Sequence, residues 1–332
     1  MIKIDKARCA LVALAFGLTY ATIGCGRTEE ATDRSAAADE TRVSVPAPAP
    51  DVPADAPTLA EAYPTLSNGA LRLARLTRLP SGTLLHAEGL ILTDRDLEDE
   101  LAQAPAELRE QLRKNAILIV EQMATRDLLV AQARRSTGNE RLDEDRLLKQ
   151  FFDEMTGKAV VTDAEITAFY EENQAMVGEI PFERVKPQIR QHILQEKQQR
   201  IVEDYVQGLG ENIVIALSKD WVADQAPLML DSPLDKARAS GKPTFASFGA
   251  DSCMPCQMMK PTREAIQEKY GAKLNVVYVH VDRDQMLASR YGVRGIPHIF
   301  FFDGEGKEIH GQTGLMTEDQ IEEWLKKIGV TL

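Results

Sequence analysis

The chain has no basic domain and no basic stripe. Its 332 residues carry a net charge of -12 at pH 7, with a pI near 5.1. This excludes nucleic acid as a partner, because binding to a phosphate backbone requires clustered Lys and Arg. Aromatic residues are also sparse, at 6 %, whereas charged residues reach 27 %, as in a soluble protein. The length predicts roughly two domains with additional tails.

The N-terminal apolar run is too short to cross a membrane. It extends from Cys9 to Gly17, continues with interruptions to Ile23, and follows a short basic start. A spanning helix needs ~20 apolar residues, whereas a basic start, a short apolar run and small residues are typical of a secretory signal. We therefore interpret residues 1–24 as a signal peptide. The rest of the chain is predicted to be exported, where disulfides persist.

The end of this segment, Thr22-Ile23-Gly24-Cys25, resembles a bacterial lipobox. In that family the cysteine is diacylated and becomes the first residue, which makes Cys25 the predicted lipidation site. Thr22 stands where the family usually has Leu or Val, and an ordinary cleaved signal or an uncleaved anchor is the alternative. The resemblance implies a protein anchored by lipid on the periplasmic side of a bacterial membrane.

Residues 25–62 are predicted to be a disordered tether rich in Pro and Ala. The stretch is dominated by Thr, Glu, Ala and Asp, and positions 45–50 alternate small residues with proline. Such a segment cannot bury enough apolar surface to fold. We expect it to hold the folded part of the chain away from the membrane surface.

Residues 63–218 are predicted to form an all-α domain. Apolar residues between Leu108 and Ala133 recur at helical spacing, and Gly138 ends the run. The short segment 84–92 alternates loosely, which predicts either a strand pair or an extended lead-in. Further helices are expected from Thr162, which opens a capping box, and from 181 or 182 to about 209.

Part of this region resembles a known family. The sequence Thr162–Ile166 followed by Phe169–Asn173 is similar to the linker helix of SurA/PpiC-type periplasmic chaperones, and Leu112–Ala133 is similar to the helix before it. That family normally has a parvulin isomerase domain after this linker, but only a few residues separate Asn173 from Phe182. The isomerase domain and its activity are therefore expected to be absent. The resemblance implies a helical arm that offers an apolar cradle to unfolded client segments, with an unrelated all-helical adaptor as the alternative.

Residues 219–332 are predicted to form a small α/β domain, because short apolar strands alternate here with helices. The expected strands cover 243–248, 274–281, 299–302 and 308–310. The expected helices cover 232–239, the segment opened by Cys253, then 286–291 and 317–328.

Cysteine is scarce, and only one pair lies outside the N-terminal segment. This pair is Cys253-Met254-Pro255-Cys256, at a predicted strand-to-helix junction. A Cys-x-x-Cys in that position, with Gly295-Ile296-Pro297 downstream, is a specific pattern. A cysteine at a helix start is favoured as a thiolate by unpaired amides and the helix dipole.

These landmarks resemble thioredoxin over about 100 residues. The resemblance implies a thioredoxin fold and thiol–disulfide oxidoreductase activity, with Cys253 attacking a substrate disulfide and Cys256 resolving the mixed disulfide. It also implies a Cys253–Cys256 disulfide and a cis Ile296–Pro297 bond that faces the cysteines. The backbone of Ile296 would then pair with a substrate peptide. Pro261 corresponds to the proline that kinks the family's active-site helix.

Four residues are expected to tune the dithiol. Pro255 limits the backbone between the two sulfurs. Ser252 replaces the tryptophan that usually precedes the first cysteine, and Ser247 stands where cytosolic thioredoxins keep a buried acid. His298 stands where thioredoxins have Thr, and a nearby imidazolium would stabilise the Cys253 thiolate and make the pair more oxidising. The direction of electron flow stays open.

A metal site is the competing interpretation of the same residues. Cys253, Cys256 and His298 are suitable ligands for copper or zinc, but Pro297 normally blocks such chelation and the chain has no second cysteine pair near them. We therefore predict no metal and no cofactor.

The predicted function is that of a membrane-tethered oxidoreductase with a helical client-binding arm. Its partners would be exported proteins that carry thiols or disulfides, together with a membrane thiol electron donor or acceptor. Two alternatives remain. One is a non-catalytic chaperone or peptide-binding lipoprotein that uses the thioredoxin fold as a scaffold, and the other is a thiol donor in a copper or haem pathway.

Overall fold

The computed structural model describes residues 51–332 except 68, 139–141, 175–179 and 332. The predicted signal peptide, Cys25 and most of the predicted tether lie outside these residues. The end of the tether prediction is wrong, because Ala56 and Leu59 are buried and Thr58 caps the helix α2 (Leu59–Ala62). Among the helices of the described part, none combines the length and apolarity needed to cross a bilayer.

The first half of the chain contains a four-stranded sheet. Its strands are β1 (Arg75–Thr77), β2 (Thr83–Ala87), β3 (Leu90–Thr93) and β4 (Ile215–Ser218), in the order β1-β4-β2-β3. Strand β4 runs parallel to β1 and antiparallel to β2. The prediction of an all-α domain is therefore wrong, although the region is rich in helix. The strand pair predicted over 84–92 is confirmed as the antiparallel pair β2 and β3. Strands β1 and β4 were not predicted, because both are short and β4 is remote in sequence from both of its neighbours.

Helices pack around this sheet and share its core. They are η1 (Ala70–Leu73), α3 (Asp94–Gln103), α4 (Ala106–Lys114), α5 (Ala116–Thr137), α6 (Glu144–Thr156) and α10 (Lys219–Met229). The predicted apolar run divides at Asn115 into α4 and α5, and Gly138 ends α5 in the left-handed conformation, as predicted. Helix α6 has no counterpart in the prediction. Val222, Ala226 and Met229 of α10 join this core, although the predicted boundary assigns them to the second domain.

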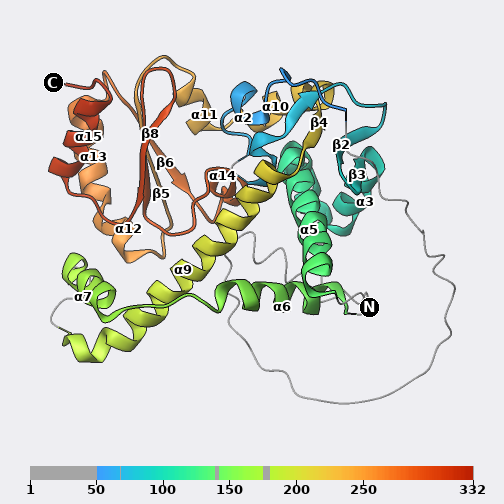
Figure 1. Ribbon diagram of the computed structural model, residues 1–332. Helices are drawn as coiled ribbons and strands as arrows, with labels where there is room; N and C mark the ends of the chain where they lie inside the picture. The colour runs from blue at the N-terminus through green and yellow to red at the C-terminus, as the bar shows by residue number, and fades with distance from the viewer. Residues whose placement is uncertain (1–50, 68, 139–141, 175–179, 332) are drawn as a thin grey trace.

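An arm projects from this first body. It consists of α7 (Asp163–Glu172) and the N-terminal part of α9 (Phe182–Asn212), and the capping box predicted at Thr162 is present. The arm has a small core of its own, formed by Val161, Ile166, Ile189 and Ile193. At its other end, α9 packs on η1 and buries Leu209 in the main core. Figure 1 shows α9 as one long helix that connects the arm to the body.

The second half of the chain has a separate sheet. Strands β5 (Thr244–Gly249), β6 (Asn275–His280), β7 (His298–Phe302) and β8 (Glu308–Thr313) pair in the order β6-β5-β7-β8, and only β5 and β6 are parallel. The predicted strands and helices of this domain are confirmed. The helices are α11 (Pro233–Arg238), α12 (Met254–Met258), α13 (Lys260–Tyr270), α14 (Gln285–Arg290) and α15 (Glu318–Lys327).

Helices cover both faces of this second sheet. On one face, Ile266 of α13 and Ile321 of α15 pack against Phe245 and Phe301. The helices α11 and α14 cover the opposite face, where Phe248, Phe300 and Phe302 are buried. The alternating strand residues thus form two apolar layers, one on each face of the sheet. The loops at one end of the sheet do not contribute to these layers and can therefore hold a functional site.

Two polar contacts connect this domain to the first body. The buried guanidinium of Arg290 donates hydrogen bonds to the Met229 carbonyl and to the carboxylate of Asp235. On the surface, Arg294 forms an ion pair of 2.9 Å with Glu203 of α9. The end of α14 is therefore held by α10, and the segment after it is held by α9.

Candidate active site

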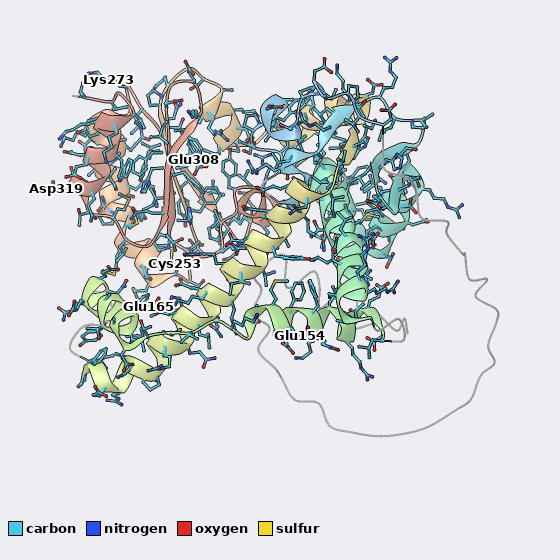
Figure 2. The ribbon with its side chains drawn as sticks, viewed as in Figure 1. Glu154, Glu165, Cys253, Lys273, Glu308 and Asp319 are labelled. Atoms are coloured by element: carbon cyan, nitrogen blue, oxygen red, sulfur yellow. A yellow bond between two sulfur atoms is a disulfide. The ribbon has the colours of Figure 1, made fainter. Side chains whose placement is uncertain are left out.

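The two cysteines lie where β5 passes into α12. Cys253 is the N-cap of α12, and its Sγ accepts a hydrogen bond of 3.2 Å from the Cys256 amide. The structure joins the two sulfurs in a disulfide, with the Cα atoms 5.2 Å apart. Cys253 is half-buried, whereas Cys256 is only 5 % exposed. Figure 2 shows Cys253 at the end of the domain on the side of the arm.

Two prolines shape the helix that carries the pair. Pro255 is the second residue of α12, where its missing N–H costs no intrahelical hydrogen bond. The helix is interrupted at Met259, and Pro261 lies in the first turn of α13. The interruption coincides with the kink expected at Pro261.

The Ile296–Pro297 peptide bond is cis and packs against the cysteines. The carbonyl oxygen of Ile296 is 3.8 Å from the Sγ of Cys253. The Pro297 carbonyl accepts a hydrogen bond of 2.8 Å from the Gly314 amide, which fixes this loop to the end of β8. A Cβ at Gly295 would come within 2.9 Å of Thr313, so the close approach of the two segments requires glycine there.

Ser247 is buried in β5, where its register partner on β6 is Tyr278. Both residues lie on the sheet face that α13 covers. The Tyr278 hydroxyl and the Cys256 Sγ are each 3.1 Å from the point where a Cβ on Gly249 would stand. Arg263 of α13 stacks over the Tyr278 ring, 4.2 Å from its centroid. Tyr278 was not among the predicted site residues, although its alternation with Val276 on β6 could have placed it on this face.

The expected charge on His298 is contradicted by its surroundings. Its Nδ1 is 2.9 Å from the Thr313 hydroxyl, and its ring packs on Phe300 with centroids 4.4 Å apart. Burial, followed by the nearby His310, lowers the pKa of His298 to about 4. The imidazole is therefore neutral at physiological pH, and the prediction that an imidazolium stabilises the Cys253 thiolate is wrong.

The surface around Cys253 is open and partly apolar. Ser252 is exposed, and the side chains of Met254 and Met258 are 68 % and 54 % exposed. Methionine side chains are flexible and polarisable, so they adapt to partners of different shape. The surface beside Cys253 thus consists of a small polar residue and two methionines, where a tryptophan usually precedes the first cysteine.

The three residues of the competing metal interpretation have other partners in the structure. Within the described residues, no three His, Cys, Asp or Glu side chains gather as metal ligands. Cys253 and Cys256 are joined to each other, and His298 directs its Nδ1 toward Thr313.

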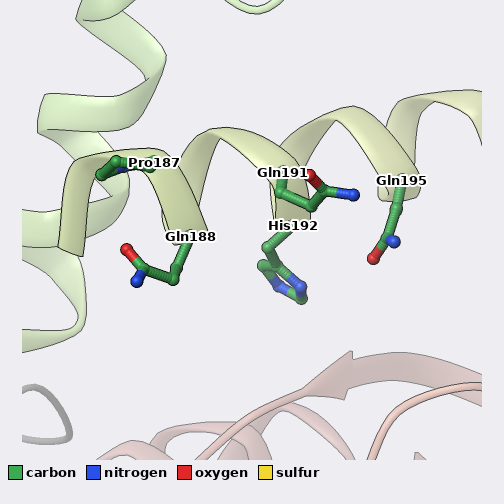
Figure 3. A pocket seen from close by; sticks show the side chains of 5 residues that line it. All are labelled: Pro187, Gln188, Gln191, His192 and Gln195. Atoms are coloured by element: carbon green, nitrogen blue, oxygen red, sulfur yellow. The ribbon is translucent and has the colours of Figure 1, made fainter.

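A groove on the arm was not anticipated from the sequence. It is a shallow, open depression of about 350 Å³ on one side of α9, lined by Pro187, Gln188, Gln191, His192 and Gln195. Figure 3 shows Gln188, His192 and Gln195 extending from α9 toward the second domain. The lining contains amide and imidazole groups and no Lys, Arg, Asp or Glu.

Comparison with known proteins agrees with this geometry. Residues 230–329 match the family described as thioredoxin-like domain. Thioredoxin 1 of Nostoc sp. is 33 % identical over 88 residues, which are 26 % of this chain and 81 % of that protein. Thioredoxin 1 of Chlorobaculum tepidum is 34 % identical over 95 residues, which are 29 % of this chain and 94 % of that protein.

A larger relative is similar over the same domain. The thiol:disulfide interchange protein TxlA homolog of Synechocystis sp. is 37 % identical over 84 residues, or 25 % of this chain and 47 % of that protein. The chain spans about half, or less, of the length of the larger relatives that it matches. These similarities support a redox function for the C-terminal domain.

Proposed function

Because the chain belongs to the thioredoxin family through its C-terminal domain, we propose that it catalyses thiol–disulfide exchange through Cys253 and Cys256. One observation carries this proposal. A half-buried Cys253 begins α12, accepts the Cys256 amide hydrogen bond and lies beside the cis Ile296–Pro297 bond. This arrangement provides an accessible sulfur, stabilisation for its thiolate and a backbone edge for a substrate.

The exchange proceeds in two steps. In the reducing direction, the Cys253 thiolate attacks one sulfur of a substrate disulfide, and the other substrate sulfur leaves as a thiolate. The Cys256 thiolate then attacks the Sγ of Cys253, which forms the internal disulfide and releases the second substrate thiolate. The substrate gains two electrons and the dithiol loses two. In the oxidising direction the same steps run in reverse.

The amide of Cys256 supports the first step. Its N–H points at the Cys253 sulfur, so it donates a hydrogen bond to the thiolate form. The Ile296 carbonyl lies on the other side of the same sulfur, where an extended peptide next to the scissile disulfide can pair with the loop backbone.

Insulin reduction in the presence of dithiothreitol tests the proposal. We expect the wild-type protein to accelerate the reaction and Cys253→Ser to be inactive. Cys256→Ser should form a stable mixed disulfide with the substrate, because the resolving thiol is missing. Equal rates for wild type and Cys253→Ser would remove the enzymatic function.

The proposed place of action is the periplasmic side of a bacterial membrane. This rests on the N-terminal sequence, in which a signal-like segment ends in a lipobox-like Cys25. Metabolic labelling with a fatty acid should label the wild-type protein but not Cys25→Ser, and Cys25→Ser should retain insulin reduction. Labelling of both proteins, or of neither, would contradict lipidation at Cys25.

The proposed role of the arm is to hold exported client proteins next to the dithiol. The groove on α9 presents glutamine side chains, which can donate to and accept from a peptide backbone irrespective of its sequence. The ion pair between Glu203 and Arg294 connects this helix to the loop that carries Ile296. A client held by α9 would thus be close to the backbone edge beside Cys253.

Alanine substitutions in the groove test the arm. The variant Gln188→Ala/Gln191→Ala/Gln195→Ala should reduce unfolded protein disulfides several-fold more slowly, while its rate with a small disulfide stays unchanged. Gln199→Ala, on an exposed part of the same helix outside the groove, is the matched control. Parallel losses with both substrates would contradict a client-binding role.

A non-catalytic chaperone is the second candidate, and the same groove favours it. It predicts that suppression of client aggregation survives Cys253→Ser/Cys256→Ser but is lost in the triple groove variant.

A further inference from the structure

Cys256 must lose a proton before it can resolve the mixed disulfide. Only the thiolate is nucleophilic, and Cys256 is just 5 % exposed, so water has little access to it. Ser247, on the strand beneath, carries a hydroxyl that does not ionise at neutral pH. The proton therefore needs another path between this buried sulfur and solvent.

The hydroxyl of Tyr278 lies on such a path. Both it and the Cys256 Sγ are 3.1 Å from the Cβ position of Gly249, so the two atoms are separated by at most twice that distance. Glycine leaves this space free of a side chain. Tyr278 is 38 % exposed, so the same side chain reaches from the neighbourhood of the buried thiol to solvent.

The electrostatic environment keeps this phenol protonated. Burial raises the pKa of Tyr278, and Arg263, which stacks on its ring, lowers it by a smaller amount. At neutral pH the group is therefore a hydrogen-bond donor. Other charged or titratable groups around it are Asp251 after β5, Asp282 and Arg283 after β6, and His280 on β6 itself. Glu264 and Glu268 of α13 line a surface pocket together with Tyr278.

We propose that Tyr278 is a positioning residue for Cys256, whose hydroxyl relays a proton between this thiol and water. When Cys256 deprotonates, its proton passes to the Tyr278 oxygen while the phenol proton passes to water, so the phenol is regenerated. The Cys256 thiolate then attacks Cys253, and the departing substrate thiolate takes up a proton from solvent. This inference rests on the proposed exchange function.

Dithiobis(nitrobenzoate) separates the two steps, because attack by Cys253 and resolution by Cys256 each release one coloured thiolate. The reduced full-length protein is mixed with a stoichiometric amount of this reagent over a range of pH. Tyr278→Phe keeps the ring on which Arg263 stacks and removes only the hydroxyl. We expect its first phase to be unchanged and its second phase to be at least about tenfold slower at pH 7. The difference should close at high pH, where hydroxide removes the proton directly.

Two further variants separate a relay from a packing effect. Tyr270→Phe is the control, because Tyr270 is a tyrosine of the same domain, at the end of α13, whose hydroxyl faces Glu322. It should leave both phases unchanged. Tyr278→His retains a group that can carry a proton, so it should recover most of the second-phase rate even if Tyr278→Phe folds poorly.

The outcomes distinguish the relay from the exchange itself. A wild-type protein that releases no coloured thiolate would remove the proposed function. A wild type with two phases and a Tyr278→Phe variant with the same second phase at every pH would overturn only the relay. Equal slowing of both phases, or slowing that persists at high pH, would also overturn it, since either result indicates a structural role.

Discussion

The two four-stranded sheets of this chain are assembled from very different segments. All strands of β6-β5-β7-β8 lie within residues 244–313, and each is joined to the next by one or two helices or by a turn. In β1-β4-β2-β3, the strand β4 is inserted only after the chain has passed through α3 to α9. The first kind of sheet carries the candidate site and was predictable. The second kind of sheet anchors the arm. Its strand order was not predictable, because the pairing of its central strands depends on contacts between distant residues.

The two regions also satisfy buried charge in different ways. In the C-terminal domain, Arg290 is paired with Asp235, and both side chains are almost inaccessible. In the first body, Glu121 on α5 instead accepts hydrogen bonds from the Ser67 hydroxyl and the Leu71 amide. The pair contains both charges needed for neutralisation, whereas the lone acid has only neutral donors. This contrast predicts different responses to mutation and to pH.

The largest effect is expected from breaking the buried pair. Arg290→Ala leaves the Asp235 carboxylate buried without its partner, which should lower the free energy of unfolding by about 3–5 kcal/mol. Urea denaturation measures the loss. The exposed pair Arg95–Asp99 supplies the control, since Arg95→Ala should cost about 0.5 kcal/mol or less. Similar losses for the two variants would refute the importance of burial.

The second prediction asks whether the two sheets unfold together. Leu217 of β4 is fully buried in the first core, and Leu217→Ala should cost about 2–5 kcal/mol there. The chain has two tryptophans, Trp221 against the first core and Trp324 against the second. Two variants that each keep one tryptophan allow the fluorescence of Trp221 and of Trp324 to be followed separately. We expect Leu217→Ala to lower the denaturation midpoint reported by Trp221 more than the midpoint reported by Trp324. Equal shifts would show that the two regions form one cooperative unit.

The third prediction concerns the lone acid. Burial raises the pKa of Glu121 above its unfolded value, so the protonated form is favoured in the folded protein. Its contribution to stability is full below the unfolded pKa and is lost as pH rises through the folded pKa. Because glutamine does not ionise, Glu121→Gln should not lose stability in this way as pH rises. Each tenfold difference between the acid dissociation constants of the folded and unfolded states corresponds to about 1.4 kcal/mol of stability. Thermal denaturation between pH 4 and pH 8 should therefore show the variant gaining on wild type as pH rises. A constant difference would contradict the assignment.

The smallest effect is expected at His298. Its pKa of about 4 means that the ring stays neutral throughout the working range of a dithiol. An NMR titration should show no histidine transition for this ring between pH 5.5 and 8, and His298→Thr should leave the pH profile of exchange nearly unchanged. A transition near the ordinary histidine pKa of about 6.5 would restore the idea that an imidazolium tunes Cys253.

By itself, the sequence determined the features that neighbouring residues specify. The capping box at Thr162, the helices that begin next to Ser232 and Thr317, the strand-to-helix junction at Cys253 and the cis bond before Pro297 all fall where the sequence predicted them. Each depends on hydrogen bonds or steric limits within a few residues, or on a motif that a known family shares. Such features can be recognised without knowing what packs around them.

Tertiary structure alone decided the rest. It inserted β4 between β1 and β2, placed α10 in the first core, neutralised His298 and brought the Tyr278 hydroxyl near Cys256. Burial and the identity of distant neighbours control a strand's partners and a side chain's pKa, and neither is encoded in local spacing. The dithiol was therefore evident from a short motif, whereas the groups that would govern its protons emerged only once distant strands had been brought together.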